Sequence, residues 1–263
     1  MGFWGWKLLR FAAAIIGLLA TLATPAYAAP LGDVRLSKSS SDVQIESILV
    51  VGDSMAGQLA AGLRQHPAKP QVEFVLSVGA RYQSRQSLAK LREHIESRPV
   101  DAVVVMFGSW DVASFEPGEF RKNLASGEYR LRLSEWRAAI ASAGVAPIWV
   151  TMPATRDITL SRDLARVNRV VRSVAREFGD EVLAAGDVLD NRRRTFRRKV
   201  SLRGGRVTVR SGDGLHLCAA GTLLVADQVL SSLGRSRQLR PRRLVRAAKQ
   251  NFLAGSNFDS RGC

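Results

Sequence analysis

Residues 45–54, Ile-Glu-Ser-Ile-Leu-Val-Val-Gly-Asp-Ser, decide the fold of this chain. Their apolar part is short, rich in β-branched side chains and ended by a glycine, as expected for a buried strand. The residues that follow, Met55 to Arg64, have the apolar periodicity of a helix. A strand that continues into a helix at a glycine is typical of the crossover units of parallel sheets.

The same alternation of apolar runs and amphipathic segments continues along the chain. The predicted strands are Ile45–Val51, Val72–Val78, Ala102–Phe107, Pro147–Met152 and Glu181–Ala185, and the predicted helices are Met55–Arg64, Ser84–Ser97, Glu128–Ala143, Ser161–Phe178 and Ala219–Leu233. We therefore predict an α/β fold, a three-layer α/β/α sandwich around a five-stranded parallel sheet.

Ligands of open parallel sheets bind beyond the carboxyl ends of the strands. The loops at that edge are 52–55, 79–83, 108–112, 152–157 and 186–215, and we expect the chemistry of the protein there.

The start of the chain has the features of an export signal. Basic residues precede a short apolar run at 11–22, and Ala26-Tyr27-Ala28 offers a small-x-small cleavage pattern. The apolar run is shorter than the roughly 20 residues that span a bilayer, so an uncleaved anchor is the weaker alternative. We predict a signal peptide at 1–28 and a periplasmic or secreted protein.

The remaining segments differ in composition. Residues 29–44 are polar and rich in serine, which is typical of a linker. The strand and helix pattern fills residues 45–234, which we predict to form one domain. Residues 235–263 form a basic tail, which we predict to be an appendage outside the core.

The chain carries a formal net charge of +16. Basic side chains at 192–199 follow the last predicted strand and can border a site, where they would concentrate an anionic envelope polymer or contact a membrane surface. Nucleic acid also fits the charge, but export and the lack of a recognition motif argue against it. A solvated run that only aids solubility is the alternative, both here and in the tail.

Only two cysteines, Cys218 and Cys263, are present. They form no disulfide framework and, with three histidines, no metal-ligand cluster, so we expect no metal and no other cofactor. A bridge between the two would fit an oxidising compartment. We favour instead a buried Cys218 and a free Cys263.

Ser54 falls where the first predicted strand meets the first predicted helix. Free amides and the helix dipole favour developing negative charge at such a position. Serine is also a common N-cap, and for Gly52-Asp53-Ser54 taken alone this structural role is the better explanation.

A second motif near the end of the sequence changes this balance. Asp213 and His216 lie on a glycine-marked loop before the last predicted helix, whereas His66 and His94 fall at helix ends, where we expect them solvated. A serine nucleophile needs an adjacent base, and an acid must hold the imidazole of that base in the correct tautomer. We therefore predict Ser54 as nucleophile, His216 as base and Asp213 as orienting acid.

With these two motifs in this order, residues 46–233 resemble the SGNH/GDSL hydrolase superfamily. The resemblance is greatest to exported bacterial members that carry Gly-Asp-Gly-x-His-Leu, here residues 212–217. It implies the flavodoxin-like SGNH hydrolase fold and a catalytic domain at 45–234.

The resemblance also implies an oxyanion hole. Gly79 matches the superfamily's glycine after the second strand, so the amides of Ser54 and Gly79 are the expected donors. In the Gly-x-Asn-Asp block, here residues 108–111, Trp110 stands in place of the Asn. Three interpretations follow: Trp110 donates through its indole nitrogen, it forms a wall that excludes water and holds an acyl acceptor, or the domain has lost activity and only binds.

The resemblance implies an esterase that acts on O-acyl groups of carbohydrates or lipids through an acyl-enzyme. Similar tryptophan-bearing blocks occur in SGNH domains attached to membrane acyltransferases that modify envelope polysaccharide. An O-acyltransferase and a non-catalytic binding module are therefore the alternatives. On the loops around the site, we predict Arg81, Asp111 and Arg194 as substrate-binding residues.

Overall fold

The computed structural model of the chain describes residues 45–76, 79–114, 118–191, 194–202, 205–234, 241–254 and 262–263. All of them belong to one compact unit that spans Val43–Cys263. The predicted signal peptide, the linker and Arg192 and Arg193 of the basic run lie outside the described residues.

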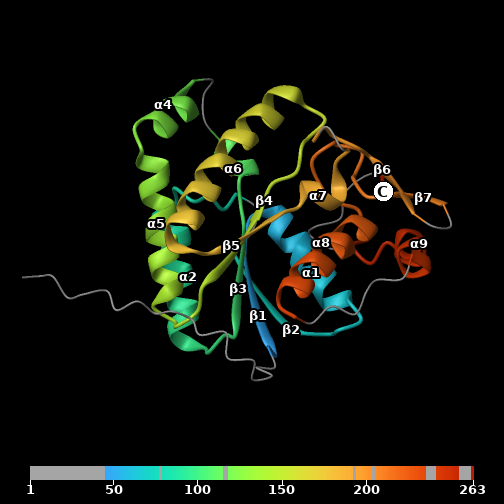
Figure 1. Ribbon diagram of the computed structural model, residues 1–263, viewed down its shortest axis with the longest axis horizontal. Coiled ribbons are helices and arrows are strands. Elements are labelled where there is room, and N and C mark those ends of the chain that lie inside the picture. The colour runs from blue at the N-terminus through green and yellow to red at the C-terminus, as the bar shows by residue number, and fades with distance from the viewer. Residues whose placement is uncertain are drawn as a thin grey trace, which may run out of the picture. The chain divides into compact units, whose positions relative to one another are not determined.

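A five-stranded parallel sheet lies at the centre of this unit, as predicted (Figure 1). Its strands are β1 (Ser47–Gly52), β2 (Gln71–Val75), β3 (Ala102–Met106), β4 (Pro147–Thr151) and β5 (Glu181–Ala184), in the order β2-β1-β3-β4-β5. The chain moves from β1 to β2 on one side and then crosses to β3 on the other. This is the doubly wound, flavodoxin-like topology, and its switch point lies between β1 and β3, where such sheets bind ligands.

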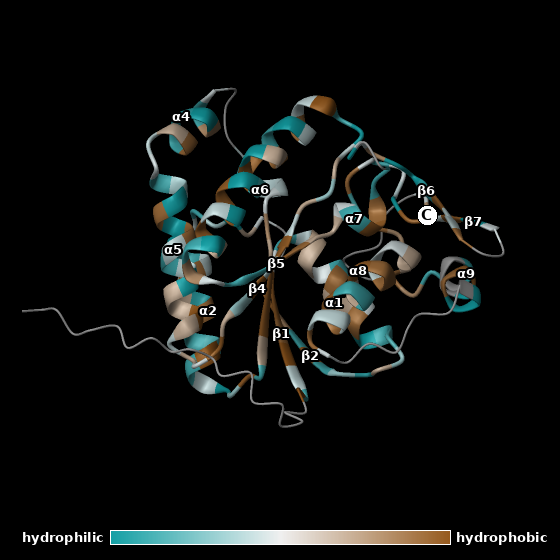
Figure 2. Ribbon diagram, viewed as in Figure 1, coloured by the Kyte–Doolittle hydropathy of each residue, from teal (hydrophilic) through white to brown (hydrophobic). Residues whose placement is uncertain are grey.

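Helices cover both faces of the sheet. Helices α1 (Ser54–Gln65) and α8 (Ala219–Ser232) pack on one face, and α2 (Arg85–Ser97), α5 (Glu128–Ala141) and α6 (Ile158–Phe178) cover the other (Figure 1). Figure 2 shows apolar residues along the central strands and mixed apolar and polar residues on the helices, as expected for amphipathic helices that cover a buried sheet. Within the described part of the chain, no helix combines the length and apolar character needed to cross a membrane.

Several short elements lie between the predicted ones. They are α3 (Ser109–Ala113), α4 (Glu119–Ala125), α7 (Gly186–Leu189), an antiparallel pair formed by β6 (Lys199–Leu202) and β7 (Gly205–Thr208), and α9 (Pro241–Gln250). The β6–β7 pair buries Val200 and Val207 against the same core as α1 and α8. Much of the predicted loop at 186–215 is therefore ordered structure beside the last helix.

The prediction that the tail is an appendage outside the core is wrong for the described part of it. Helix α9 packs on α8, with Leu244 buried against Leu223. Leu253, after the helix, is also buried. Burial of these leucines stabilises the docking of a segment whose exposed residues, Arg242 and Arg246 among them, are basic.

The preference for a free Cys263 is also wrong. Cys218 and Cys263 form a disulfide with their Cα atoms 5.4 Å apart. Cys218 is the residue before α8 and lies two positions after His216. The bond therefore fixes the C-terminus beside the loop that carries the candidate base.

His66 is not solvated as predicted. It ends α1 as a buried residue, and its Nε2 lies 3.1 Å from Oδ1 of Asp227 on α8. Burial lowers the pKa of His66, and the Asp227 carboxylate opposes this effect. His94, at the end of α2, is partly buried, with its Nε2 3.0 Å from Glu73.

Candidate active site

Ser54 is the first residue of α1 and lies directly beyond the carboxyl end of β1. A glycine is required at the turn before it, because Gly52 has φ +159° and an added Cβ would lie 2.0 Å from the Met106 carbonyl oxygen. Asp53 caps the helix by accepting a hydrogen bond from the Met55 amide at 3.0 Å. Ser54 is therefore not the N-cap, and its hydroxyl is free for another partner.

That partner is His216. The Ser54 Oγ lies 2.9 Å from His216 Nε2, and His216 Nδ1 lies 2.7 Å from Asp213 Oδ2. A carboxylate at Nδ1 holds the proton on that nitrogen, which leaves Nε2 able to accept the hydroxyl proton. The structure thus brings together the three side chains predicted as nucleophile, base and orienting acid.

Asp213 is held as an anion by its hydrogen bonds. Its Oδ1 accepts from the amides of Leu215, at 2.8 Å, and His216, at 3.0 Å, and from the Ser211 hydroxyl. Partial burial alone would raise the pKa of Asp213, but these bonds and the His216 ring lower the pKa well below its usual range. The carboxylate is therefore charged at any pH at which the protein would function.

Gln58, which the sequence did not single out, connects the two halves of the site. It lies one turn after Ser54 on α1 and is fully buried. Its Nε2 donates to the Leu217 carbonyl at 3.1 Å, and its Oε1 accepts from the Leu217 amide at 2.8 Å. The helix of the nucleophile and the loop of the base are thereby bonded directly to each other.

Arg210, which was likewise not predicted, holds the loop that carries His216. It is completely buried, and its Nη2 donates to the Leu215 carbonyl at 2.9 Å. Its guanidinium also lies 3.6 Å from Asp190 and 5.1 Å from the centre of the Phe196 ring. Burial lowers the pKa of Arg210 to about 10, which still leaves it charged at neutral pH.

A third contact connects the Ser54 turn to the Trp110 turn. The Asp53 carboxylate accepts hydrogen bonds from the Ser109 hydroxyl at 2.6 Å and the Ser109 amide at 3.2 Å. Burial raises the pKa of Asp53, and the bonds from Ser109 and Met55 oppose this rise. The start of α3, and with it Trp110, is therefore positioned by the residue next to Ser54.

The predicted oxyanion donors lie at the same edge of the sheet. The Ser54 amide is in the first turn of α1, where helix amides have no intrahelical partner. Gly79 follows β2, is exposed and has φ +89°. Trp110 is 37% exposed, and no described residue accepts a hydrogen bond from its indole nitrogen. The oxyanion roles of all three stay predictions.

The prediction that Asp111 binds substrate is wrong. Asp111 is fully buried and accepts a hydrogen bond from the Tyr82 amide at 3.0 Å, so it cannot contact a substrate. Burial raises the pKa of Asp111 well above its usual range, and the nearby Asp53 raises it further. Its role is to hold the loop after β2 against α3.

The other two predicted substrate-binding residues are exposed to different degrees. Arg81 is partly exposed and donates to the Ser114 hydroxyl at 2.9 Å, close to Trp110 in sequence. Arg194 is largely exposed, forms an ion pair with Asp187 and lines a separate cavity beyond β4 and β5. Among the described residues, no three His, Cys, Asp or Glu side chains cluster as metal ligands do.

The chain was compared with protein families, curated proteins and solved structures. A family model described as "Protein of unknown function (DUF459)" matches residues 47–232. A search of curated proteins finds no match.

Solved structures share the fold at low sequence identity. A variant of an acetyl-xylooligosaccharide esterase from Geobacillus stearothermophilus is 17% identical, with 74% of this chain and 97% of that chain covered and a TM-score of 0.54. A lipolytic protein of the G-D-S-L family from Veillonella parvula is 14% identical, with 72% and 98% covered and a TM-score of 0.53. An alpha/beta hydrolase enzyme from the metagenome of Lake Arreo is 18% identical, with 73% and 97% covered and a TM-score of 0.52.

These likenesses show an SGNH-type fold, and the family match covers most of the domain that carries Ser54, Asp213 and His216. The chain therefore belongs to the family of proteins of unknown function DUF459, an SGNH-like family.

Proposed function

We propose that this protein is an exported serine esterase that hydrolyses carboxylic esters, with Ser54 as the nucleophile. The observation that supports this most directly is the unbroken chain of contacts from Ser54 Oγ to His216 Nε2 and from His216 Nδ1 to Asp213. A serine, a base and an anionic acid in this order are the parts that nucleophilic acyl transfer requires.

In the first half of the reaction, Ser54 Oγ attacks the ester carbonyl while its proton passes to His216 Nε2. Asp213 stabilises the imidazolium that forms. The tetrahedral intermediate then collapses, the bond to the alcohol breaks, and His216 returns the proton to the leaving alkoxide. Ser54 is left as an acyl ester.

In the second half, water attacks the acyl-Ser54 carbonyl and gives its proton to His216. As this intermediate collapses, the bond between the acyl carbon and Ser54 Oγ breaks, His216 returns the proton to Oγ, and the carboxylic acid is released. The amides of Ser54 and Gly79 donate to the oxyanion in both halves, and we assign the third donor to the indole nitrogen of Trp110.

The proposed substrates are O-acyl groups on carbohydrates or lipids. The similar structures named as an acetyl-xylooligosaccharide esterase and a lipolytic protein support these two classes. Exposed basic residues on α9 and the net charge of +16 favour an anionic envelope polymer as the carrier of the ester.

Export to the periplasm or the medium is part of the proposal. The sequence at 1–28 supports it, and so does the Cys218–Cys263 disulfide, because such bonds persist in oxidising compartments. We expect the mature protein isolated from the cell envelope or medium to begin at Ala29. An intact N-terminus at Met1 would instead indicate an uncleaved anchor.

The central test uses hydrolysis of p-nitrophenyl acetate together with labelling by a fluorophosphonate. We expect wild type to turn over the ester and to be labelled at Ser54, as mapped by mass spectrometry. Ser54→Ala should lose both, whereas Ser173→Ala, a change at an exposed serine of α6, should retain both. Wild-type protein that neither hydrolyses nor becomes labelled would be a binding module and not an esterase.

O-acyl transfer is the second candidate function, and the half-exposed Trp110 is the observation that favours it. A large, partly exposed indole on the turn after β3 can hold a sugar acceptor and exclude water from the acyl-enzyme. Addition of an acceptor saccharide to the acetyl ester assay should then yield an acetylated sugar, detected by mass spectrometry. Release of free acetate alone, unchanged by the acceptor, would exclude transfer to that acceptor.

A further inference from the structure

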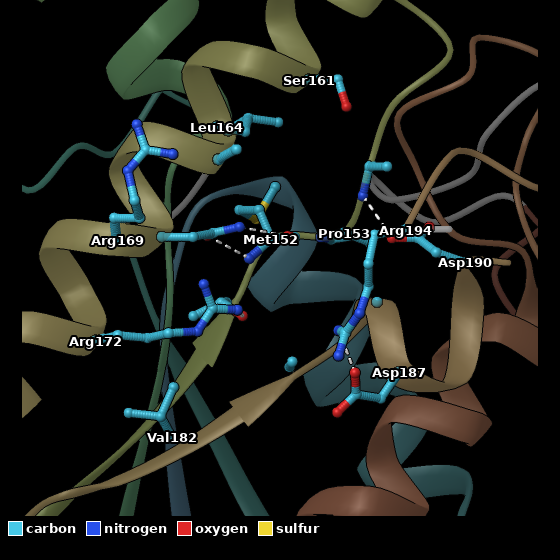
Figure 3. A pocket seen from close by; sticks show the side chains of 16 residues that line it. Met152, Pro153, Ser161, Leu164, Arg169, Arg172, Val182, Asp187, Asp190 and Arg194 are labelled. Atoms are coloured by element: carbon cyan, nitrogen blue, oxygen red, sulfur yellow. Dashed lines mark hydrogen bonds and ion pairs between the residues drawn. The ribbon is translucent and has the colours of Figure 1, made fainter. Parts of the chain in front are cut away.

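A cavity lies beyond the carboxyl ends of β4 and β5, between α6 and α7 (Figure 3). Its volume is about 600 Å³, within the range of pockets that hold small organic ligands. Neither Ser54 nor His216 lines it. Because neighbouring strands are roughly 4.8 Å apart, β4 and β5 lie about 10 and 15 Å from β1, so the cavity is centred two to three strands away from Ser54.

Two guanidinium groups enter this cavity from opposite sides. Arg172 extends from α6, and Arg194 extends from the chain after α7 (Figure 3). Arg169, one turn before Arg172, adds a third positive charge at the exposed rim. The planar guanidinium group is suited to bidentate hydrogen bonding with carboxylate and phosphate groups.

Both acidic residues of the wall are paired with arginines, one of them inside the wall and one outside it. Asp187 forms an ion pair with Arg194. Asp190 accepts from the Ala154 amide at 2.8 Å and lies 3.6 Å from the buried Arg210. The net charge that the described residues leave in the cavity is therefore positive.

Among the described residues, no carboxylate forms an ion pair with Arg172, which is the more buried of the two wall arginines, Arg169 and Arg172, that lack one. It is partly buried, and its one described hydrogen bond goes to the neutral Thr151 hydroxyl at 3.3 Å. Burial lowers the pKa of Arg172, the nearby Arg194 lowers it further, and the Asp187 carboxylate opposes these two effects. A bound anion would oppose both effects, because it would accept hydrogen bonds from the guanidinium group and its negative charge would offset the repulsion between the two arginines.

The cavity wall is preformed by hydrogen bonds. Asn168 on α6 accepts from the Met152 amide at 3.0 Å and donates to the Met152 carbonyl at 2.8 Å, which fixes the turn after β4. Leu164 and Val182 give the wall apolar surface beside the arginines. Apolar walls with a few placed polar groups are typical of sites for small organic ligands.

We propose that this cavity binds a carboxylate or phosphate group carried by a ligand about the size of a sugar unit, with Arg172 as the principal partner of the anion and Arg194 as the second. Binding of the anion does not require ester hydrolysis at Ser54.

The test is isothermal titration calorimetry of the full-length protein with glucuronate, glucose 6-phosphate, inorganic phosphate and glucose. We expect saturable binding of at least one charged sugar, with a Kd of about 1 mM or tighter, and no binding of glucose. Glucuronate and glucose 6-phosphate show whether the site prefers a carboxylate or a phosphate group. Comparison of glucose 6-phosphate with inorganic phosphate shows whether the sugar ring contributes to affinity.

Variants separate this site from the one at Ser54. Arg172→Gln should weaken binding roughly ten-fold or more, because a charge-assisted hydrogen bond is lost. Arg176→Gln, a change at an exposed position one turn further along α6, is the matched control and should bind as wild type does. Ser54→Ala should also bind unchanged, so loss of esterase activity and loss of anion binding are measured independently.

Arg194→Gln provides a second variant, because its side chain is 63% exposed and its loss should leave folding intact. We expect it to weaken binding less than Arg172→Gln does. The proposal is overturned if neither charged sugar binds, if glucose binds equally well, or if both arginine variants bind as tightly as wild type.

Discussion

The side chain of Gln58 and the backbone of Leu217 are bonded to each other in both directions, at 3.1 and 2.8 Å. Gln58 is one turn after Ser54, and Leu217 directly follows His216. The pair therefore joins segments that are 159 residues apart in the chain and sets the distance between the candidate nucleophile and its base.

We expect Gln58→Ala to reduce ester turnover and to destabilise the fold. The substitution leaves the Leu217 amide and carbonyl buried without partners, at a cost of about 1–3 kcal/mol each. Misplacement of His216 should lower kcat about ten- to hundred-fold with little change in KM. Urea unfolding and p-nitrophenyl acetate kinetics measure the two effects. A variant with wild-type kcat would show that the bond is not needed to position His216.

The stabilising contribution of the Asp213 carboxylate should appear in the pH dependence of the free energy of unfolding. Its lowered pKa in the folded protein means that its stabilising contribution is present above the ordinary aspartate pKa of about 3.9 and is lost as the pH falls below it. Wild type should therefore lose stability from about pH 5 to 3 more steeply than Asp213→Asn, followed by urea midpoints at each pH. Parallel curves for the two proteins would contradict this assignment.

The contribution of Asp111 to stability should change with pH in the opposite direction to that of Asp213. Burial raises the pKa of Asp111 in the folded protein, so its contribution to stability is largest below pH 4 and is lost as the pH rises through the raised value. Asp111→Asn keeps an oxygen for the Tyr82 amide and removes the charge. We expect its stability relative to wild type to increase from about pH 4 upward in the same unfolding series. A variant that becomes less stable relative to wild type over this range would show that Asp111 is needed as an anion.

The sequence predicted those elements whose pattern is long enough to be distinctive. The five strands and five long helices have apolar runs or faces that extend over most of their length. The short elements α3 and α7 and the β6–β7 pair have too few residues for a periodic pattern. Tertiary contacts stabilise them, as the burial of Val200 and Val207 shows.

The site could be predicted only where the residue types are rare. The chain has three histidines, and one of them follows an aspartate by three positions on a glycine-marked loop, so His216 and Asp213 were distinctive. Gln58 is one polar residue on a helix, and Arg210 is one of 39 basic residues. Their importance comes from complete burial and from backbone partners, neither of which a sequence pattern reveals.

The disulfide was missed because sequence separation gives no information on spatial distance. Cys218 and Cys263 are 45 residues apart, and the basic composition of the tail suggested a solvated end. The described part of the tail is docked on the domain by the buried Leu244 and Leu253, by Val245 and Phe252 beside them, and by the disulfide.

Removal of the disulfide should destabilise the protein measurably. For a closed loop of 45 residues, the loss of unfolded-state entropy corresponds to roughly 4 kcal/mol. The double variant Cys218→Ser and Cys263→Ser should therefore unfold about 10 °C below wild type in a thermal melt. Reductant should lower the Tm of wild type towards that of the variant and leave the variant unchanged. A wild type that is unaffected by full reduction would show that the bond contributes nothing to stability.

Trp110 is the position at which the proposed oxyanion hole can be tested most directly. The indole nitrogen has no acceptor among the described residues, and the contact between Asp53 and Ser109 fixes the turn that carries it. If it donates to the oxyanion, Trp110→Phe should lower kcat about a hundred- to thousand-fold with little change in KM, because the ring remains but the donor is lost. Trp110→Asn, which supplies a side-chain amide, should keep more activity than Trp110→Phe. Should Trp110→Phe hydrolyse p-nitrophenyl acetate as fast as wild type, the indole acts as a wall, and the oxyanion depends on the amides of Ser54 and Gly79 alone.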